Sequence, residues 1–152
     1  MIAVLQRIRS ASVTADGVPS GSVGEGLYIL LGVVNGDAEA DAERLAEKIA
    51  KLRIFSDSQG KMNLSILDVG GEALVVSNFT LAANYAHGNR PDYMNAAPPS
   101  LAEPLYRYFT ERLRERVGKV ETGVFGADMT TEMVTDGPVT IVMHSELIGG
   151  KK

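Results

Sequence analysis

The chain has 152 residues, 45% of them hydrophobic and 22% charged, which fits one globular domain with a real core and excludes general disorder. Fifteen basic and nineteen acidic residues give a formal charge of −4. This charge argues against a protein that wraps nucleic acid, although not against one that binds only the end of an RNA. The absence of cysteine excludes disulfides, thiolate nucleophiles and zinc–thiolate sites.

The first half of the chain predicts strands and one helix. Residues 2–8 alternate loosely between apolar and polar side chains, which indicates a strand, and Asp16-Gly17 predicts a hairpin turn after it. Residues 27–34 (LYILLGVV) form a continuous apolar run with the length of a strand covered on both faces. From Asp37 to Leu52 the apolar residues recur at helical spacing, so we expect the first helix to begin at Asp37.

The second half predicts one more helix and several strands. Ser100, with Glu103 three residues later, is typical of a capping box and predicts the start of the second helix, which Gly118 is placed to end. Before it, the buried strand predicted for residues 73–77 runs into a polar loop. The remaining predicted strands cover residues 53–55, 120–122, 129–134 and 139–143. We therefore expect a single domain over residues 1–152, of the mixed α/β class, rich in strands and with two main helices.

The sequence contains neither a targeting segment nor a common catalytic motif. The amino terminus lacks the layout of a signal peptide and no apolar run approaches the ~20 residues that span a bilayer, so we expect a cytoplasmic protein with no membrane partner. His87 and His144 could each act as a general base in principle, but no GxSxG sequence presents a serine nucleophile. No histidine spacing suits a metal, and we expect neither a metal nor another cofactor.

Two short segments could carry chemistry. In Ser77–Leu81 (SNFTL) a buried strand ends in hydroxyl, amide and aromatic side chains, where free backbone donors can face a ligand. In Asp136–Thr140 (DGPVT) a Gly-Pro turn enters the last strand. From the residues alone, a loop cap and a plain turn are the better explanations of these two segments.

The segments taken together resemble the D-aminoacyl-tRNA deacylases, the DTD family, over nearly the whole chain. Many short matches in the right order make this resemblance specific. They are VLQR (Val4–Arg7), ASVT (Ala11–Thr14), LRIF (Leu52–Phe55), GKMNLS (Gly60–Ser65), SNFTL, Arg90-Pro91, AAPP (Ala96–Pro99), ETGVFGADM (Glu121–Met129) and DGPVT.

The resemblance implies an α/β/β homodimer that hydrolyses the ester between tRNA and a D-amino acid, and also glycyl-tRNA, while it rejects L-aminoacyl-tRNA. Its partner is therefore the acceptor end of a tRNA. The resemblance further implies that Gly137 and Pro138, joined by a cis bond, reach across the dimer as a chiral gate. Arg7 is implied to brace this gate.

The resemblance assigns substrate contacts to the end of the buried strand. Phe79 and Thr80 are implied to orient the ester and to offer backbone hydrogen bonds, while Ser77, Asn78 and Met129 are implied to bind the substrate. The sequence departs from the family pattern at Asn78, where a glutamine is usual, and at Thr135, where an asparagine is common. The first departure puts one substrate contact in doubt, and the second puts the geometry of the turn in doubt.

Three alternatives stay open at this stage. Thr80 could be a covalent nucleophile, although no base lies within sequence reach to activate it. The chain could also bind an RNA end without turnover, with residues 85–93 as a stacking loop. A dimeric structural protein is the third alternative.

Overall fold

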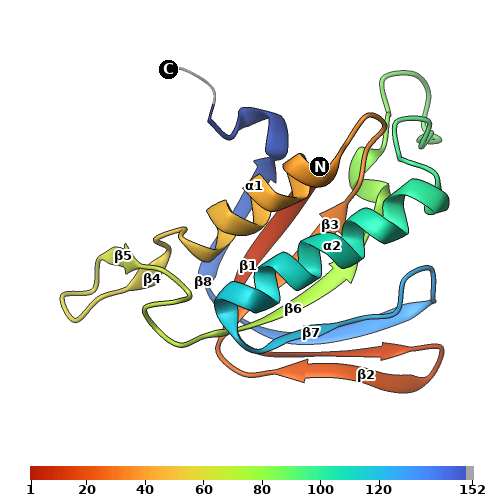
Figure 1. Ribbon diagram of the computed structural model, residues 1–152. Coiled ribbons are helices and arrows are strands. Elements are labelled where there is room, and N and C mark those ends of the chain that lie inside the picture. Colours follow the sequence, from red (N-terminus) through yellow and green to blue (C-terminus); the bar gives the residue numbers. More distant parts are fainter. Residues whose placement is uncertain (150–152) are drawn as a thin grey trace.

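The computed structural model describes residues 1–149 and shows one twisted sheet with two helices packed on one of its faces (Figure 1). The strand order is β2-β1-β3-β6-β7, and β8 pairs with the other edge of β1. The sheet strands are β1 (Ile2–Ala15), β2 (Val18–Val23), β3 (Gly26–Gly32), β6 (Glu72–Ser77), β7 (Val120–Thr122) and β8 (Met129–His144). A separate hairpin consists of β4 (Phe55–Ser56) and β5 (Met62–Leu64).

Strand β1 is paired with other strands along both of its edges. One edge pairs with β8 along nearly the whole strand, from Ile2 opposite His144 to Ala15 opposite Met129. The other edge pairs first with β3 and then with β2. The turn at Asp16 and Gly17 confirms the predicted hairpin, and the predicted strand over residues 2–8 proves to be the first half of a longer one.

The helices α1 (Glu39–Ala50) and α2 (Pro99–Val117) begin differently from the prediction. Helix α1 starts two residues after Asp37, because the Asp37 carboxylate is bound to groups outside the helix. The predicted capping box at Ser100 is wrong, since the N-cap of α2 is Pro98 and no side chain caps the helix. Proline suits the first helical position, because its φ is already helical and the N–H that it lacks would have no partner inside the helix.

The sheet separates two hydrophobic clusters, and this makes an α/β/β arrangement, as expected. Alternate residues of β6 point to opposite sides: Ala73 and Val75 pack under the helices, while Leu74 and Val76 pack against the hairpin of β1 and β2. All four are buried, as expected of a strand in the middle of a sheet that is covered on both faces. The hairpin curls over so far that the Ser20 hydroxyl donates to the Thr122 carbonyl at 2.9 Å.

The parallel pair of β3 and β6 fixes where the site lies. Residue Gly26 begins β3 with φ +154°, and a Cβ there would overlap the backbone of Glu72, so only glycine allows this close approach. Because β3 and β6 run parallel, both end at the same edge of the sheet, at Gly32 and Ser77.

Within residues 1–149, no helix combines the length and the apolar character needed to cross a membrane.

Candidate active site

A cleft of about 550 Å³ opens at this shared end of β3 and β6. The 3-10 helix η1 (Phe79–Ala82) follows β6 directly, and α2 forms the opposite wall. Most of the lining side chains are apolar. The lining residues are Leu31, Val33, Ser77, Asn78, Phe79, Tyr93, Ala96, Ala97, Pro99, Ala102, Tyr106, Phe125, Gly126, Ala127 and Met129.

The strand end predicted from SNFTL lies in this cleft. Ser77 closes β6, and the Asn78 backbone N–H still donates to the Leu31 carbonyl at 2.8 Å, which holds the chain against β3. The Asn78 Oδ1 accepts hydrogen bonds from the Thr80 N–H at 3.2 Å and from the Thr80 hydroxyl. Asn78 thus caps η1 and fixes the rotamer of Thr80. Thr80 itself is exposed and lies just beyond the lining residues.

Two aromatic pairs form walls of the cleft. Phe79 and Tyr93 meet edge to face with ring centroids 5.1 Å apart, and Phe79 remains 58% exposed. Tyr106 and Phe125 lie 5.8 Å apart, and the Tyr106 hydroxyl donates to the buried Val75 carbonyl at 2.9 Å. An exposed aromatic face beside an open cleft is suited to stacking on a base or ring.

Sequence reasoning missed Tyr106 and Phe125. The sequence pattern did not single out Tyr106, yet Ala102, Tyr106 and Thr110 are buried at a spacing of four residues. A helical row that includes small and polar side chains was a usable signal for a face turned toward a cleft. Phe125 lies within the matched ETGVFGADM segment but was not singled out.

Met129 enters the cleft as the resemblance implies. Met129 is the first residue of β8 and lies beside Gly123, where an added Cβ would overlap the Met129 sulfur. The flexible thioether therefore fills space that only a glycine leaves open. The structure thus brings together Ser77, Asn78, Phe79 and Met129 in one lining, with Thr80 adjacent.

The cleft is electrostatically bland. Its lining, all within the described residues, includes no aspartate, glutamate, histidine, lysine or arginine. His87 lies outside it, and His144 lies in a different pocket. Burial raises the pKa of Tyr106 to about 12, so this phenol stays neutral at physiological pH. Among residues 1–149 no cluster of three or more potential metal ligands was found. Chemistry here has to come from hydrogen bonding and position rather than from proton transfer by a side chain.

The Gly-Pro segment forms a protruding bulge on β8. In the pairing of β1 with β8, Gln6 faces Thr140 and Ile8 faces Thr135, so a single β1 residue, Arg7, faces the four residues 136–139. The bond between Gly137 and Pro138 is cis, and both residues are exposed.

Arg7 holds this bulge from beneath. Its Nε donates to the Asp136 carbonyl at 3.2 Å and lies 3.1 Å from the Asp136 carboxylate, while its Nη1 donates to the Ile54 carbonyl at 2.8 Å. The Arg7 side chain is 11% exposed, so the guanidinium makes these contacts largely away from water. The bulge is thereby fixed to both β1 and the segment before β4.

The bulge and the cleft are separate within one chain. None of Arg7, Gly137 and Pro138 belongs to the cleft lining, which β8 enters only through Met129 at its start. The predicted gate residues are therefore clustered with one another, but not with the predicted substrate-binding residues.

The sequence and the fold have counterparts among known proteins. The model of a family described as D-Tyr-tRNA(Tyr) deacylase matches residues 4–144. A protein of Ruegeria pomeroyi named D-aminoacyl-tRNA deacylase is 56% identical over 143 residues, which are 94% of this chain and 99% of that protein. One of the same name from Thermomicrobium roseum is 56% identical over 151 residues, which are 99% of this chain and 98% of that protein.

Two solved structures share the fold. One, named c-Myc DNA Unwinding Element Binding Protein, is 40% identical with a TM-score of 0.88, covering 95% of this chain and 98% of the other. The second, a probable eukaryotic D-amino acid tRNA deacylase, has a TM-score of 0.79 and 16% identity over 93% of this chain and 97% of the other, and it shows the fold alone. The chain belongs to the D-Tyr-tRNA(Tyr) deacylase family, which confirms the expected class of enzyme.

The buried phenol of Tyr106 makes a testable contribution to stability. Its pKa in the folded protein, about 12, lies above the ordinary 10.0, so the folded protein keeps this proton where the unfolded chain has lost it. The stabilisation is complete below pH 10 and is lost as the pH rises toward 12. Between pH 9 and 12 we expect the parent to lose about 2–3 kcal/mol more unfolding free energy than Tyr106→Phe.

Urea unfolding at each pH measures this difference. The exposed Tyr85 supplies the control, because Tyr85→Phe should follow the parent curve. Parallel curves for the parent and Tyr106→Phe would show that the phenol is not held neutral by the fold.

Proposed function

We propose that this chain hydrolyses the ester bond of D-aminoacyl-tRNA, releasing the free amino acid and tRNA, with the cleft at the end of β6 as its active site. The observation that carries the proposal is an open cleft with an exposed aromatic wall, a capped strand end and no ionisable side chain apart from tyrosine, in a chain of this family. We also propose that residues 1–152 act as one domain, in the cytoplasm, where charged tRNA is used, and without a membrane partner.

A cleft of this kind suits a substrate that is already activated. Water attacks the ester carbonyl and gives up a proton, the bond to the ribose oxygen breaks, and that leaving oxygen takes a proton to become a hydroxyl. The 2′-hydroxyl next to the ester can assist, so the protein has mainly to place the ester and stabilise the oxyanion. The first N–H groups of a helical turn have no partners inside that turn, and η1 begins at Phe79, at the cleft. The Asn78 side chain already accepts from the Thr80 N–H, so we assign the role of oxyanion donor to the Phe79 N–H.

The strand end provides the remaining substrate contacts in this proposal. Phe79 stacks on the terminal adenine or ribose, and Ser77 and Asn78 hydrogen-bond the substrate. Met129 packs against the amino acid at the base of the cleft. The Asn78 side-chain oxygen accepts both of its hydrogen bonds from Thr80. The side-chain NH₂ group is therefore the part of Asn78 that can donate to the substrate.

We propose that Gly137 and Pro138 form a gate in the site of a second copy of the chain. The support is that the bulge is exposed, clamped by Arg7, and outside its own cleft. Strand β8, which carries the bulge, pairs only with β1 in the described part of the chain, and Val134 and Val142 on it are 55% and 60% exposed. A long open edge with apolar side chains is what a symmetric dimer would cover.

Binding of nucleic acid without turnover is the competing function. A deacylation assay separates the two functions, because only an enzyme keeps releasing free amino acid when the protein is present at less than one equivalent of charged tRNA. A stoichiometric limit on release would favour the binding module.

The sharpest prediction concerns chirality. L- and D-residues differ only in the positions of hydrogen and side chain at Cα, so a cleft that accepts many side chains has to exclude at Cα itself. We expect cleavage of D-tyrosyl-tRNA and glycyl-tRNA, while L-tyrosyl-tRNA is spared. A loss of only ~1.4 kcal/mol at the gate would admit L-esters tenfold more readily. Pro138→Ala, which removes the ring that fixes the backbone, should reduce activity, discrimination or both.

Deacylation time courses on the three substrates measure this, with the parent and Pro138→Ala run side by side. The exposed Pro19 on β2 provides the matched control, since Pro19→Ala should leave discrimination unchanged. Comparable parent rates on L- and D-tyrosyl-tRNA would overturn the gate proposal.

The second prediction separates two roles of Thr80. Its hydroxyl donates to an amide oxygen, which cannot accept a proton as a base, so Thr80 is expected to orient rather than to attack. Thr80→Ser should keep most of the activity, and Thr80→Ala and Thr80→Val should lose about 2- to 10-fold in kcat/KM, as for one hydrogen bond. Mass spectrometry of the parent during turnover should detect no acyl-enzyme, and an observed adduct would make Thr80 the nucleophile.

The third prediction concerns assembly. We expect sedimentation at assay concentration to show a dimer. An equimolar mixture of Gly137→Val chains and Asn78→Ala/Thr80→Ala chains, allowed to exchange subunits, should recover about a quarter of the parent activity above the background of the two separate variants. The reason is that half of the dimers are mixed, and each of those contains one intact site. Activity no higher than the sum of the two separate variants, or a fully active monomer, would exclude a gate supplied by the partner.

A further inference from the structure

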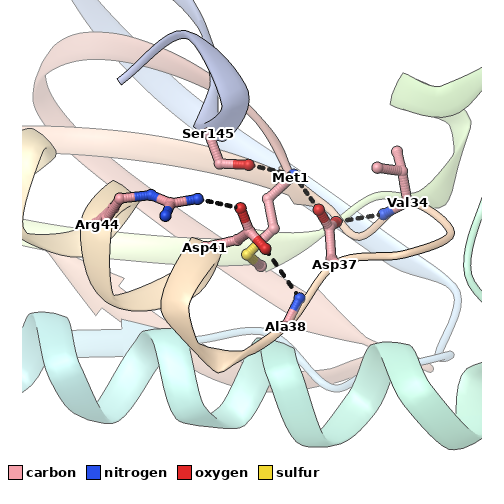
Figure 2. A network of polar contacts seen from close by, with 7 residues as sticks. All are labelled: Met1, Val34, Asp37, Ala38, Asp41, Arg44 and Ser145. Atoms are coloured by element: carbon pink, nitrogen blue, oxygen red, sulfur yellow. Dashed lines mark hydrogen bonds and ion pairs between the residues drawn. The ribbon is translucent and has the colours of Figure 1, made fainter. Parts of the chain in front are cut away.

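The amino terminus is buried in a polar network behind the site (Figure 2). The Met1 nitrogen lies 2.6 Å from the Asp37 Oδ1 and donates to the Ser145 hydroxyl oxygen at 2.7 Å. The Met1 side chain is completely buried, and the Asp37 side chain is only 7% exposed. An ammonium group is thus held by two oxygen acceptors with little access to water.

Further hydrogen bonds hold Asp37 and Ser145 in place around the Met1 nitrogen. The other Asp37 oxygen accepts from the Val34 N–H at 2.7 Å, and the Met1 carbonyl accepts from the Ser145 N–H at 2.9 Å. Figure 2 also shows the second carboxylate nearby, Asp41, whose oxygens bind the Ala38 N–H and Arg44 instead. Asp41 is therefore not a ready substitute partner for the Met1 nitrogen.

The network is connected to the wall of the cleft. Asp37 holds the Val34 backbone, and the neighbouring residues on both sides pair with the loop before α2. The Ala97 N–H donates to the Val33 carbonyl at 3.0 Å, and the Asn35 N–H donates to the Asn95 carbonyl at 3.0 Å. Val33 and Ala97 both line the cleft. One buried ion pair thus secures the turn after β3 that supports this wall.

We propose that the free α-ammonium of Met1 is a structural cation, and that its modification state controls the stability of the protein and the shape of the cleft wall. An acyl group such as formyl, or residues placed ahead of Met1, converts the ammonium into a neutral amide with a single N–H. The Asp37 carboxylate then stays buried without its cation, while the added atoms face the pocket that Met1, Asp37 and Ser145 line. The breaking of a buried charge pair is far more costly than the loss of an exposed one.

The first test compares the thermal unfolding of matched proteins. The chain is prepared with a free Met1, with N-formyl-Met1 from cell-free synthesis lacking deformylase, and with Gly-Ser ahead of Met1. Intact mass confirms each state, and a Gly-Ser extension at the carboxyl end is the control. We expect formylation to lower the Tm by roughly 6–20 °C, and the control to match the free protein. A formylated protein within about 2 °C of the free one would overturn the proposal.

A double-variant cycle shows whether the effect passes through Asp37. In Asp37→Asn the carboxylate is already absent, so formylation should cost less than half of its effect on the parent Tm. Glu39→Gln provides the matched control, an exposed carboxylate two residues along the chain, and there the full effect should persist. An equal effect of formylation in all three backgrounds would overturn the role of Asp37. Should the blocked chain fail to fold, Ser145→Ala with a free terminus should still lower the Tm, and an unchanged Tm would count against the network.

The effect on the cleft rests on the proposed function and is measured separately. Well below all Tm values, formylation should raise KM for D-tyrosyl-tRNA more than it lowers kcat, because it loosens a wall rather than removing a reacting group. An unchanged KM alongside a lowered Tm would overturn the connection to the cleft while leaving the structural cation standing. A lack of deacylation by the free protein would reject the proposed function without affecting the Tm result.

Discussion

The pairing of β1 along both edges is the constraint on which the rest of the structure depends. A strand inside a sheet has to satisfy its backbone donors and acceptors on both sides, so its neighbours are fixed in register. One edge of β1 places the long strand β8, and the other places β3 and the returning hairpin. Two features are therefore positioned relative to one strand: the Gly-Pro bulge lies opposite its middle, and the buried amino terminus lies at its beginning. Even the edge at which the cleft opens follows, because β3 sets the direction and the end of β6.

The features that follow from local sequence were predictable, and those that depend on distant partners were not. The apolar run of residues 27–34 predicts a strand buried on both faces, because burial on both sides leaves no position for a polar residue. Asp37 was expected to begin a helix, but its partner is 36 positions upstream and no local pattern reveals it. The same holds for the clamp on the bulge, where Arg7 and Asp136 are 129 positions apart. Only the resemblance to a family connected Arg7 with the Gly-Pro turn, and it did not name Asp136 as the partner.

The candidate site was hard to recognise for a chemical reason. Searches for catalytic motifs depend on ionisable or nucleophilic side chains at fixed spacing, and this cleft is lined by small, aromatic and amide groups. A backbone donor has no sequence signature, because every residue except proline has one. From the residues alone, a loop cap was the better explanation of Ser77–Leu81, and the structure confirms that a side chain of this segment caps η1. The side chain that caps η1, Asn78, also lines the cleft.

The separation of cleft and gate solves a problem of rigidity in the proposed dimer. A gate that excludes L-amino acids at Cα has to keep its shape when an L side chain contacts it. The cleft, in contrast, has to adapt to many amino acids. Both demands are difficult to meet in one loop. Here the gate is braced inside its own subunit, because Arg7 joins the Asp136 carbonyl to the Ile54 carbonyl across the base of the bulge. Its shape is therefore set before a second subunit arrives. In the proposed dimer, the cleft that receives the gate is lined by Met129 and by the exposed rings of Phe79 and Tyr93. These side chains can shift while the gate keeps its shape. Selectivity and tolerance then reside in different chains, and dimerisation brings the two together.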